Sequence, residues 1–252
     1  MELSGVAKTA IGVAYMRAWE SSQVDRLFAD PYALAFVTAQ YRQAGSAATA
    51  LAAHVVLRTR FFDDYLLQAG CDQVVLVAAG LDTRAYRLDW PAGTTLFELD
   101  QPEVLAFKQA VLDREKAAPR CTRHPVAVDL RYDWASTLRQ AGFDPARRTA
   151  WLVEGLLIYL THDEASGLLT TIGELSAPDS ELSFEDSGTV SYAGHEYAAM
   201  FKGGMGADAM AWLTEHGWKA TSHDRASVAS TYGREYPGQG GGFLTARFGG
   251  NR

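Results

Sequence analysis

The stretch Val74-Val75-Leu76-Val77-Ala78-Ala79-Gly80-Leu81-Asp82-Thr83-Arg84 decides how this chain of 252 residues folds. A short aliphatic run ends in a turn of small residues. A parallel strand buried on both faces has such a continuous apolar run, and small residues let the backbone turn tightly beside a ligand. A second apolar run ends at Asp100. Because an acid at the end of the next strand is placed to bind a ribose diol, the sequence predicts a pocket for an adenosine-containing cofactor.

The composition of the turn separates two classes of cofactor. A dinucleotide site typically has G-x-G-x-x-G, since the pyrophosphate binds backbone N–H groups at a helix N-terminus. Residues 78–83 retain only Gly80 of these glycines, and Asp82 would repel a pyrophosphate. S-adenosylmethionine has no phosphate. The turn therefore favours this methyl donor over a nicotinamide or flavin dinucleotide; a crossover turn without a ligand is the structural alternative.

Several segments resemble one family when taken together. Residues 78–88 resemble the first motif of the leucine carboxyl methyltransferase-like family of S-adenosylmethionine-dependent O-methyltransferases, in its actinobacterial and polyketide-pathway branch. Other segments resemble further motifs in the family's order. They are residues 25–32 and 58–64, which precede this motif, and residues 98–102, 128–130 and 154–160, which follow it. Ala78 departs from the eukaryotic members, which carry glycine there. The resemblance implies an α/β, Rossmann-like class I methyltransferase fold, with a seven-stranded, mostly parallel sheet of order 3-2-1-4-5-7-6 and an N-terminal helical cap.

The pattern along the chain predicts one domain over residues 1–252, with four parts. Residues 1–70 read as a helical cap, in which Asp30 and Pro31 fit a helix start. Residues 71–185 form the cofactor-binding core, with strands expected at 74–77, 95–99, 125–128, 150–153 and 181–184. Residues 186–206, rich in Gly, Ser and Tyr, are a candidate substrate lid. Residues 207–252 supply a last helix at 208–216 and strands at 218–222 and 243–248.

The resemblance also assigns residues to the adenosine half of the cofactor. Asp100 would bind the ribose, with Gln101 beside it. Asp129 would accept a hydrogen bond from the adenine amino group, and the Leu130 N–H would meet a ring nitrogen. For Asp100 and Asp129 the alternative role is that of a helix cap.

The methionine half of the cofactor has its own candidates. The turn residues Ala78 and Gly80 would approach it with their backbone. Glu154 would bind the ammonium group, because a buried acid is costly unless it is paired; a salt bridge to a neighbouring arginine is the alternative. The Arg58 guanidinium suits the methionine carboxylate, with Arg60 or a solvated role as alternatives.

The cap and the lid supply further candidates. Arg17 and Lys8 are cations that could lie near the donor carboxylate or on a solvated helix face. Candidate substrate contacts are Tyr159, Tyr192, His195 and also Arg17. Tyr159 could equally be a core residue, and His195 is either a candidate general base or a surface histidine. No residue of the sequence is assigned as catalytic.

Composition and charge indicate which partners, cofactors and cellular location to expect. The net charge of −7 argues against a nucleic-acid partner. No segment reaches 18 uninterrupted apolar residues, and no signal peptide or metal-ligand cluster is recognisable, so we expect a cytoplasmic protein without membrane or metal. Cys71 and Cys121 are expected to be free thiols. The oligomeric state is open.

The expected reaction is methyl transfer to oxygen. A carboxylate of a small molecule or peptide is favoured, because it is ionised at neutral pH and needs no base. The alternative acceptor is a hydroxyl on a polyketide or another natural product of secondary metabolism, which would need one. Two other classes stay open: a nicotinamide-dependent oxidoreductase, disfavoured by the missing glycines, and a module that binds the methyl donor without transferring its methyl group.

Overall fold

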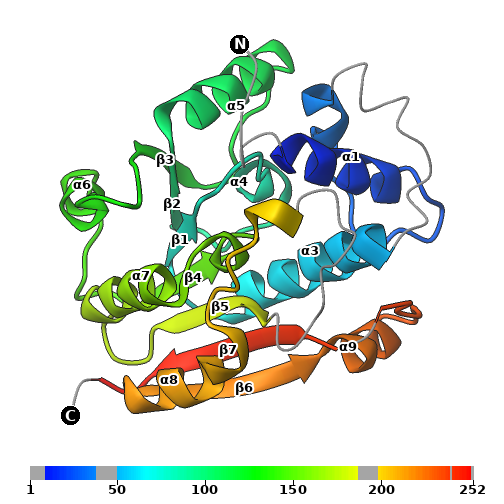
Figure 1. Ribbon diagram of the computed structural model, residues 1–252. Helices are drawn as coiled ribbons and strands as arrows, with labels where there is room; N and C mark the ends of the chain where they lie inside the picture. The colour runs from blue at the N-terminus through cyan, green and yellow to red at the C-terminus, as the bar shows by residue number, and fades with distance from the viewer. Residues whose placement is uncertain (1–8, 38–49, 187–197, 239, 251–252) are drawn as a thin grey trace.

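A central sheet of seven strands organises the computed structural model, which describes residues 9–37, 50–186, 198–238 and 240–250 (Figure 1). The strand order is β3-β2-β1-β4-β5-β7-β6. The strands are β1 (Gln73–Val77), β2 (Thr95–Asp100), β3 (Thr122–Ala127), β4 (Thr149–Val153), β5 (Glu181–Asp186), β6 (Trp218–Asp224) and β7 (Gly242–Phe248). Strands β1 to β5 pair in parallel, whereas β7 runs antiparallel to both β5 and β6. The predicted fold and strand order are confirmed.

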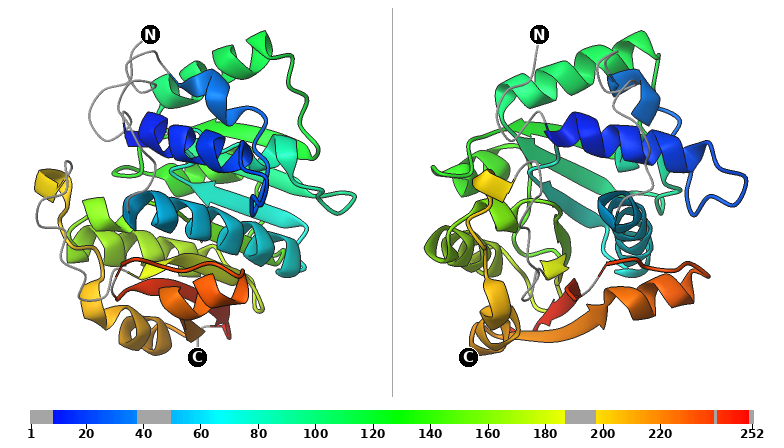
Figure 2. Two further views of the ribbon diagram at one scale, coloured as in Figure 1. Left: turned by 90° about the vertical axis from the view of Figure 1, so that its right-hand side faces the viewer. Right: turned by 45° about the vertical axis from the view of Figure 1, so that its right-hand side comes forward.

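Helices cover both faces of this sheet (Figures 1 and 2). One face is covered by α1 (Thr9–Ser21), α3 (Ala50–Gln68), α4 (Arg84–Arg87), α5 (Pro102–Arg114) and α9 (Arg225–Thr231). The other face is covered by α6 (Trp134–Gln140), α7 (His162–Glu174) and α8 (Ala209–Glu215). Four single turns of 3-10 helix complete the described elements: η2 (Ala33–Phe36), η3 (Leu157–Tyr159), η4 (Ala198–Met200) and η5 (Gly206–Asp208).

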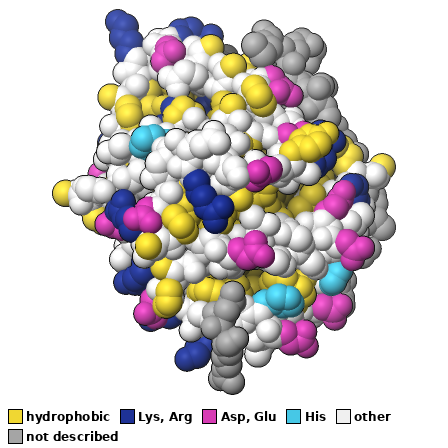
Figure 3. Space-filling model, turned by 90° about the vertical axis from the view of Figure 1, so that its left-hand side faces the viewer, with side chains coloured by type: hydrophobic (Ala, Val, Ile, Leu, Met, Phe, Trp, Pro, Cys, Tyr) yellow, Lys and Arg dark blue, Asp and Glu magenta, His cyan; other side chains and the backbone are white. Residues whose placement is uncertain are grey.

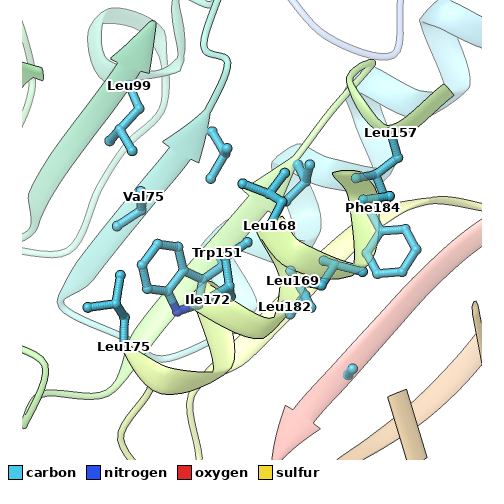
Figure 4. Close-up of a cluster of buried hydrophobic side chains, with 14 of the residues drawn as sticks. Val75, Leu99, Trp151, Leu157, Leu168, Leu169, Ile172, Leu175, Leu182 and Phe184 are labelled. Carbon is cyan, nitrogen blue, oxygen red and sulfur yellow. The ribbon is translucent and has the colours of Figure 1, made fainter. Parts of the chain in front are cut away.

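The continuous apolar run of β1 follows from this three-layer arrangement. Successive side chains of a strand point to opposite faces, and here both faces are covered. Val74 and Leu76 pack into the cluster beneath α3 and α5, whereas Val75 and Val77 pack into the cluster beneath α6 and α7. Figure 4 shows the second cluster, in which Trp151 lies among aliphatic side chains from several elements. Burying each such side chain stabilises the fold by about 1.5–3 kcal/mol.

Three local predictions differ from the structure. Strand β3 spans Thr122–Ala127 rather than 125–128, and it tolerates Pro125 because it pairs only with β2 and lies at the sheet edge. Helix α9 was not predicted, although Asp224 caps its start by accepting from the Ser227 N–H. Asp30 accepts hydrogen bonds from two following N–H groups as a cap would, but the turn it begins is only the short η2.

The described surface carries charges of both signs. On the face shown in Figure 3, Lys and Arg side chains are interspersed with Asp and Glu side chains. Among the described residues no helix combines the length and apolar character needed to cross a bilayer. The same residues contain no cluster of three or more His, Cys, Asp or Glu side chains placed to hold a metal ion.

Candidate functional site

A cavity of about 390 Å³ opens at the carboxyl ends of the parallel strands. Its walls come from the segments that follow β1, β2, β3 and β4, with α1 and α3 closing one side. The volume lies within the range of small-molecule sites, and ligands of doubly wound folds bind at this edge of the sheet.

The cavity brings together the predicted site residues that the structure describes. Those lining it are Arg17, Arg58, Ala78, Gly80, Asp100, Gln101, Asp129, Leu130, Glu154 and Tyr159. The other candidates, Lys8, Tyr192 and His195, lie outside the described residues, as does most of the predicted lid. Residues from separate sequence segments therefore line one cavity.

The turn after β1 has an unusual backbone. Ala78 and Gly80 both have positive φ angles, of 57° and 49°. A Cβ atom on Gly80 would lie 3.7 Å from the Cβ of Ala10 on α1, an ordinary van der Waals contact, so the positive φ rather than lack of space favours glycine here. The Gly80 N–H donates to Asp100 Oδ2 at 2.6 Å, which ties the turn to the end of β2.

The conformation of Ala78 leads to a stability prediction. A left-handed conformation costs a residue with a Cβ roughly 1–2 kcal/mol, whereas glycine adds about 0.5–1 kcal/mol of unfolded-state entropy. We expect Ala78→Gly to raise the free energy of unfolding by about 0.5–1 kcal/mol in urea titrations. Ala79→Gly is the matched control, because Ala79 has no positive φ; it should lower the same quantity. Equal losses in both variants would contradict this account.

Asp100 lies at the end of β2 and faces the cavity. Besides the Gly80 N–H, its carboxylate accepts from the Gln101 N–H at 2.7 Å. Burial raises the pKa of the Asp100 carboxyl, and the two backbone hydrogen bonds oppose that rise. Gln101 occupies the N-cap position of α5 with Pro102 next to it, so the helix starts directly at the cavity. The carboxylate is thus held at the cavity wall by backbone groups.

Asp129 lines the cavity from the loop after β3. Arg131 binds it with its side chain and backbone N–H, and these hydrogen bonds lower the pKa of Asp129 to about 2. Leu130 lines the cavity between them.

Glu154 and Arg58 form a salt bridge in the cavity wall. Arg58 Nε lies 2.8 Å from Glu154 Oε1, and Arg84 Nη1 donates to Glu154 Oε2 at 2.7 Å. The alternative foreseen for Glu154, a salt bridge to a neighbouring arginine, is what the structure shows. Arg60 pairs instead with Asp64, one helical turn along α3.

Arg84 is the central cation of this wall, and sequence reasoning did not single it out. Its side chain is only 2% exposed and pairs with Asp82 and Glu154, and with Asp63 at 2.6 Å. Burial acts to raise the pKa of Asp82, but the nearby Arg84 charge prevails and lowers it to about 2. The only hint in the sequence was the presence of opposite charges at Asp82 and Arg84 within the first motif.

Arg17 and Tyr159 have partners within the protein. Arg17 is buried, donating to Asp30 Oδ2 at 2.9 Å and to the Leu81 carbonyl at 2.6 Å. A solvated role is therefore wrong for Arg17, which fastens α1 to the turn after β1. Tyr159 lines the cavity and packs edge-on against Phe201.

Glu185, a largely buried acid behind the cavity, was also missed by the sequence analysis. Glu185, near the end of β5, accepts from Arg58 Nη1 at 2.6 Å and lies 3.3 Å from His54 Nε2. It also accepts from the Gly155 N–H. Burial acts to raise the pKa of Glu185, but the Arg58 charge and these hydrogen bonds lower it. The pattern of apolar and polar residues along β5 does not indicate that Glu185 binds Arg58, which lies on α3.

His54 makes the stability of the fold depend on pH. Burial, helped by the charges of Arg225 and Arg58 and opposed by Glu185, lowers the pKa of His54 from 6.5 to about 4. The folded protein thus holds it neutral, and this stability is lost as pH falls from 6.5 towards 4. Between about pH 7.5 and about pH 5 we expect His54 to remove about 2 kcal/mol from the free energy of unfolding.

Urea titrations at the two pH values check this expectation. His54→Gln should reduce the pH dependence by that amount, whereas His162→Gln, at a half-exposed histidine, should leave it unchanged. Parallel pH profiles for His54→Gln and the wild type would show that His54 titrates normally in the folded state.

This chain is similar in sequence to known methyltransferases. A family model for leucine carboxyl methyltransferase matches residues 10–173. A Frankia alni protein named as an S-adenosyl-L-methionine-dependent methyltransferase is 49% identical, covering 96% of this chain and 94% of its own. A Streptomyces coelicolor protein of the same description is 45% identical, covering 92% and 89%.

Solved structures resemble the fold at lower identity. A DUF574 family protein from Streptomyces avermitilis has a TM-score of 0.64 at 18% identity, covering 93% of this chain and 96% of its own. Human N-acetylserotonin methyltransferase, solved in complex with SAM, has a TM-score of 0.50 at 11% identity, covering 96% and 70%. From the family match and the close relatives together, the chain belongs to the leucine carboxyl methyltransferase family.

Proposed function

We propose that this protein transfers the methyl group of S-adenosylmethionine to a carboxylate oxygen of a small molecule or peptide, forming a methyl ester. The observation that carries the proposal is the cavity itself. An acid from the end of β2 lies at one part of its wall, and an arginine–glutamate pair, Arg58 and Glu154, lies at another. The relatives named as S-adenosyl-L-methionine-dependent methyltransferases support the cofactor assignment.

The residues present fit the adenosine half of the methyl donor. The Asp100 carboxylate, fixed by two backbone N–H groups, would accept hydrogen bonds from the ribose hydroxyls. Val104, Val128 and Leu130 line the cavity nearby and would flank the adenine, with Asp129 at its edge. The turn at Ala78 to Asp82 places an acid rather than a phosphate cradle beside the cavity, which suits a ligand without phosphate.

The same wall fits the charges of the methionine half. Its ammonium group would bind Glu154 and its carboxylate would bind Arg58, so each charge would meet one of opposite sign. When bound, S-adenosylmethionine supplies a methyl group on a positively charged sulfur; an oxygen nucleophile attacks the methyl carbon, and the sulfur leaves as the thioether of S-adenosylhomocysteine. The protein would contribute alignment and exclusion of water, which α1 supports by closing one side of the cavity.

The side chains of the cavity favour an acceptor that is already ionised. Among the described residues that line it there is no histidine, lysine or cysteine. Asp82 and Glu154 are both bound by Arg84, so neither is available to remove a proton from a hydroxyl. A carboxylate acceptor needs no such base.

The chemical stability of the product tests the acceptor class. Panels of carboxylic acids and phenols would be incubated with the protein and methyl-labelled donor, and the products treated with mild alkali. We expect the label to be released as methanol, because methyl esters hydrolyse under these conditions. A label that resists alkali would identify a methyl ether, and would return the search for a base to Tyr192 and His195.

A further inference from the structure

We infer that Glu185 is a positioning residue for the methionine half of the methyl donor, acting through Arg58. This inference rests on the proposed function, in which Arg58 binds the donor carboxylate. Glu185 does not line the cavity, whereas Arg58 and Gly155, the two groups it holds, both do. It therefore acts from behind the wall.

The contacts of Arg58 show what Glu185 contributes. Nη1 of Arg58 is held by Glu185 at 2.6 Å, and Nε lies 2.8 Å from Glu154. For the third nitrogen, Nη2, the described residues supply no hydrogen-bond acceptor. Nη1 is thus hydrogen-bonded to Glu185, whereas Nε is ion-paired with Glu154 without hydrogen-bond geometry. The two carboxylates together hold the guanidinium and leave one edge for an anionic ligand.

Glu185 also holds the backbone opposite Arg58. Gly155 has a φ of 66°, and a Cβ atom there would lie 3.4 Å from Arg58 Nη1. By accepting from the Gly155 N–H, Glu185 keeps the segment after β4 against the guanidinium. One carboxylate therefore fixes the distance between the arginine and the segment that carries Glu154.

The charges explain why a second carboxylate is needed. With Glu154 as its sole partner, the Arg58 guanidinium would be free to turn fully onto that carboxylate and would compete with the donor ammonium for it. Glu185 shares the charge of Arg58, and Glu185 and Arg58 are both largely buried, with side chains 14% and 10% exposed. Their attraction is therefore weakly screened. Groups that bind ligand charges depend on such supporting contacts for their geometry.

The test compares two ligands that differ only in the half of the donor in question. Isothermal titration calorimetry would measure S-adenosylhomocysteine, which has the amino-acid end, and 5′-methylthioadenosine, which lacks it. In Glu185→Gln we expect S-adenosylhomocysteine to bind roughly ten- to hundredfold more weakly, the range of one charge-assisted hydrogen bond. The affinity for 5′-methylthioadenosine should change by less than about twofold.

A matched control lies on the same strand. Glu181, at the start of β5, has a carboxylate that is also 14% exposed and pairs with Arg247 at the surface. Glu181→Gln should leave both affinities unchanged. Glu185→Asp, which withdraws the carboxylate while keeping its charge, is the second variant and should give the same selective loss.

Each outcome bears on the inference. An equal loss for both ligands would mean that Glu185 merely supports the cavity wall, and unchanged binding of S-adenosylhomocysteine would mean that Arg58 needs no positioning; either overturns the inference. If the wild type bound neither ligand, the proposed function would fail instead.

Discussion

Replacing Asp100 with alanine is expected to weaken the binding of S-adenosylhomocysteine by about 2–4 kcal/mol, the combined effect of lost charged hydrogen bonds and unsatisfied partners. Asp100 is the acid at the end of β2, and it is fixed toward the cavity by the N–H groups of Gly80 and Gln101. Without the carboxylate, the ribose hydroxyls would be buried with no acceptor. Titration calorimetry on the purified variant measures the loss.

A modified ligand separates the loss of the ribose contact from damage to the turn. The 2′-deoxy form of S-adenosylhomocysteine should bind the wild type more weakly than the parent ligand, because it cannot use Asp100 fully. In Asp100→Ala the two ligands should bind alike. Asp163→Ala, at a fully exposed position of α7, controls for the loss of an acid elsewhere. If the 2′-deoxy ligand remained weaker in Asp100→Ala, the ribose would be held by another group.

The central strands were predictable because they carry a strong local signal, whereas the strand order was expected from the family resemblance. Val74–Val77 and Leu96–Leu99 are buried on both sides, so their composition alone identifies central parallel strands. Helix α9 lacks such a signal: it spans Arg225–Thr231 and its sequence is mostly small and polar. Its helical state depends on the Asp224 cap and on packing against α3, which sequence periodicity does not report.

The candidate site was predictable where residues follow strand ends. Asp100 and Glu154 come directly after apolar runs, and the parallel topology brings them to one edge of the sheet. Arg84 and Glu185 were missed because their roles depend on partners that are distant in the sequence. Arg84 reaches Asp63 on α3 and Glu154 after β4, and only the folded chain brings these three side chains together.

Replacing Arg84 with methionine is expected to lower the free energy of unfolding by about 3–5 kcal/mol, the cost of breaking a buried ion pair by removing one partner. Methionine keeps much of the side-chain volume but cannot pair with the three carboxylates of Asp63, Asp82 and Glu154. Asp63 would keep Arg87 and Glu154 would keep Arg58, but Asp82 would lose its ion pair in a wall that solvent barely reaches. Urea titration of the ligand-free variant measures the effect.

The same substitution at an exposed salt bridge is the control. Arg120 pairs with Asp89 where the two side chains are 51% and 93% exposed, and such pairs contribute about 0–1 kcal/mol. Arg120→Met should therefore be nearly neutral, and a similar small loss in Arg84→Met would show that the buried carboxylates do not depend on Arg84.

The pH dependence of the loss identifies its cause. Carboxylates left without Arg84 should have raised pKa values in the folded variant. The folded variant then takes up protons at a higher pH than its unfolded chain does, which stabilises the folded variant as pH falls. The difference in unfolding free energy between wild type and Arg84→Met should therefore shrink from about pH 7.5 to about pH 5. A loss caused by a packing defect would not change with pH. The slope thus shows whether Arg84 stabilises this wall by its charge or by the space it fills.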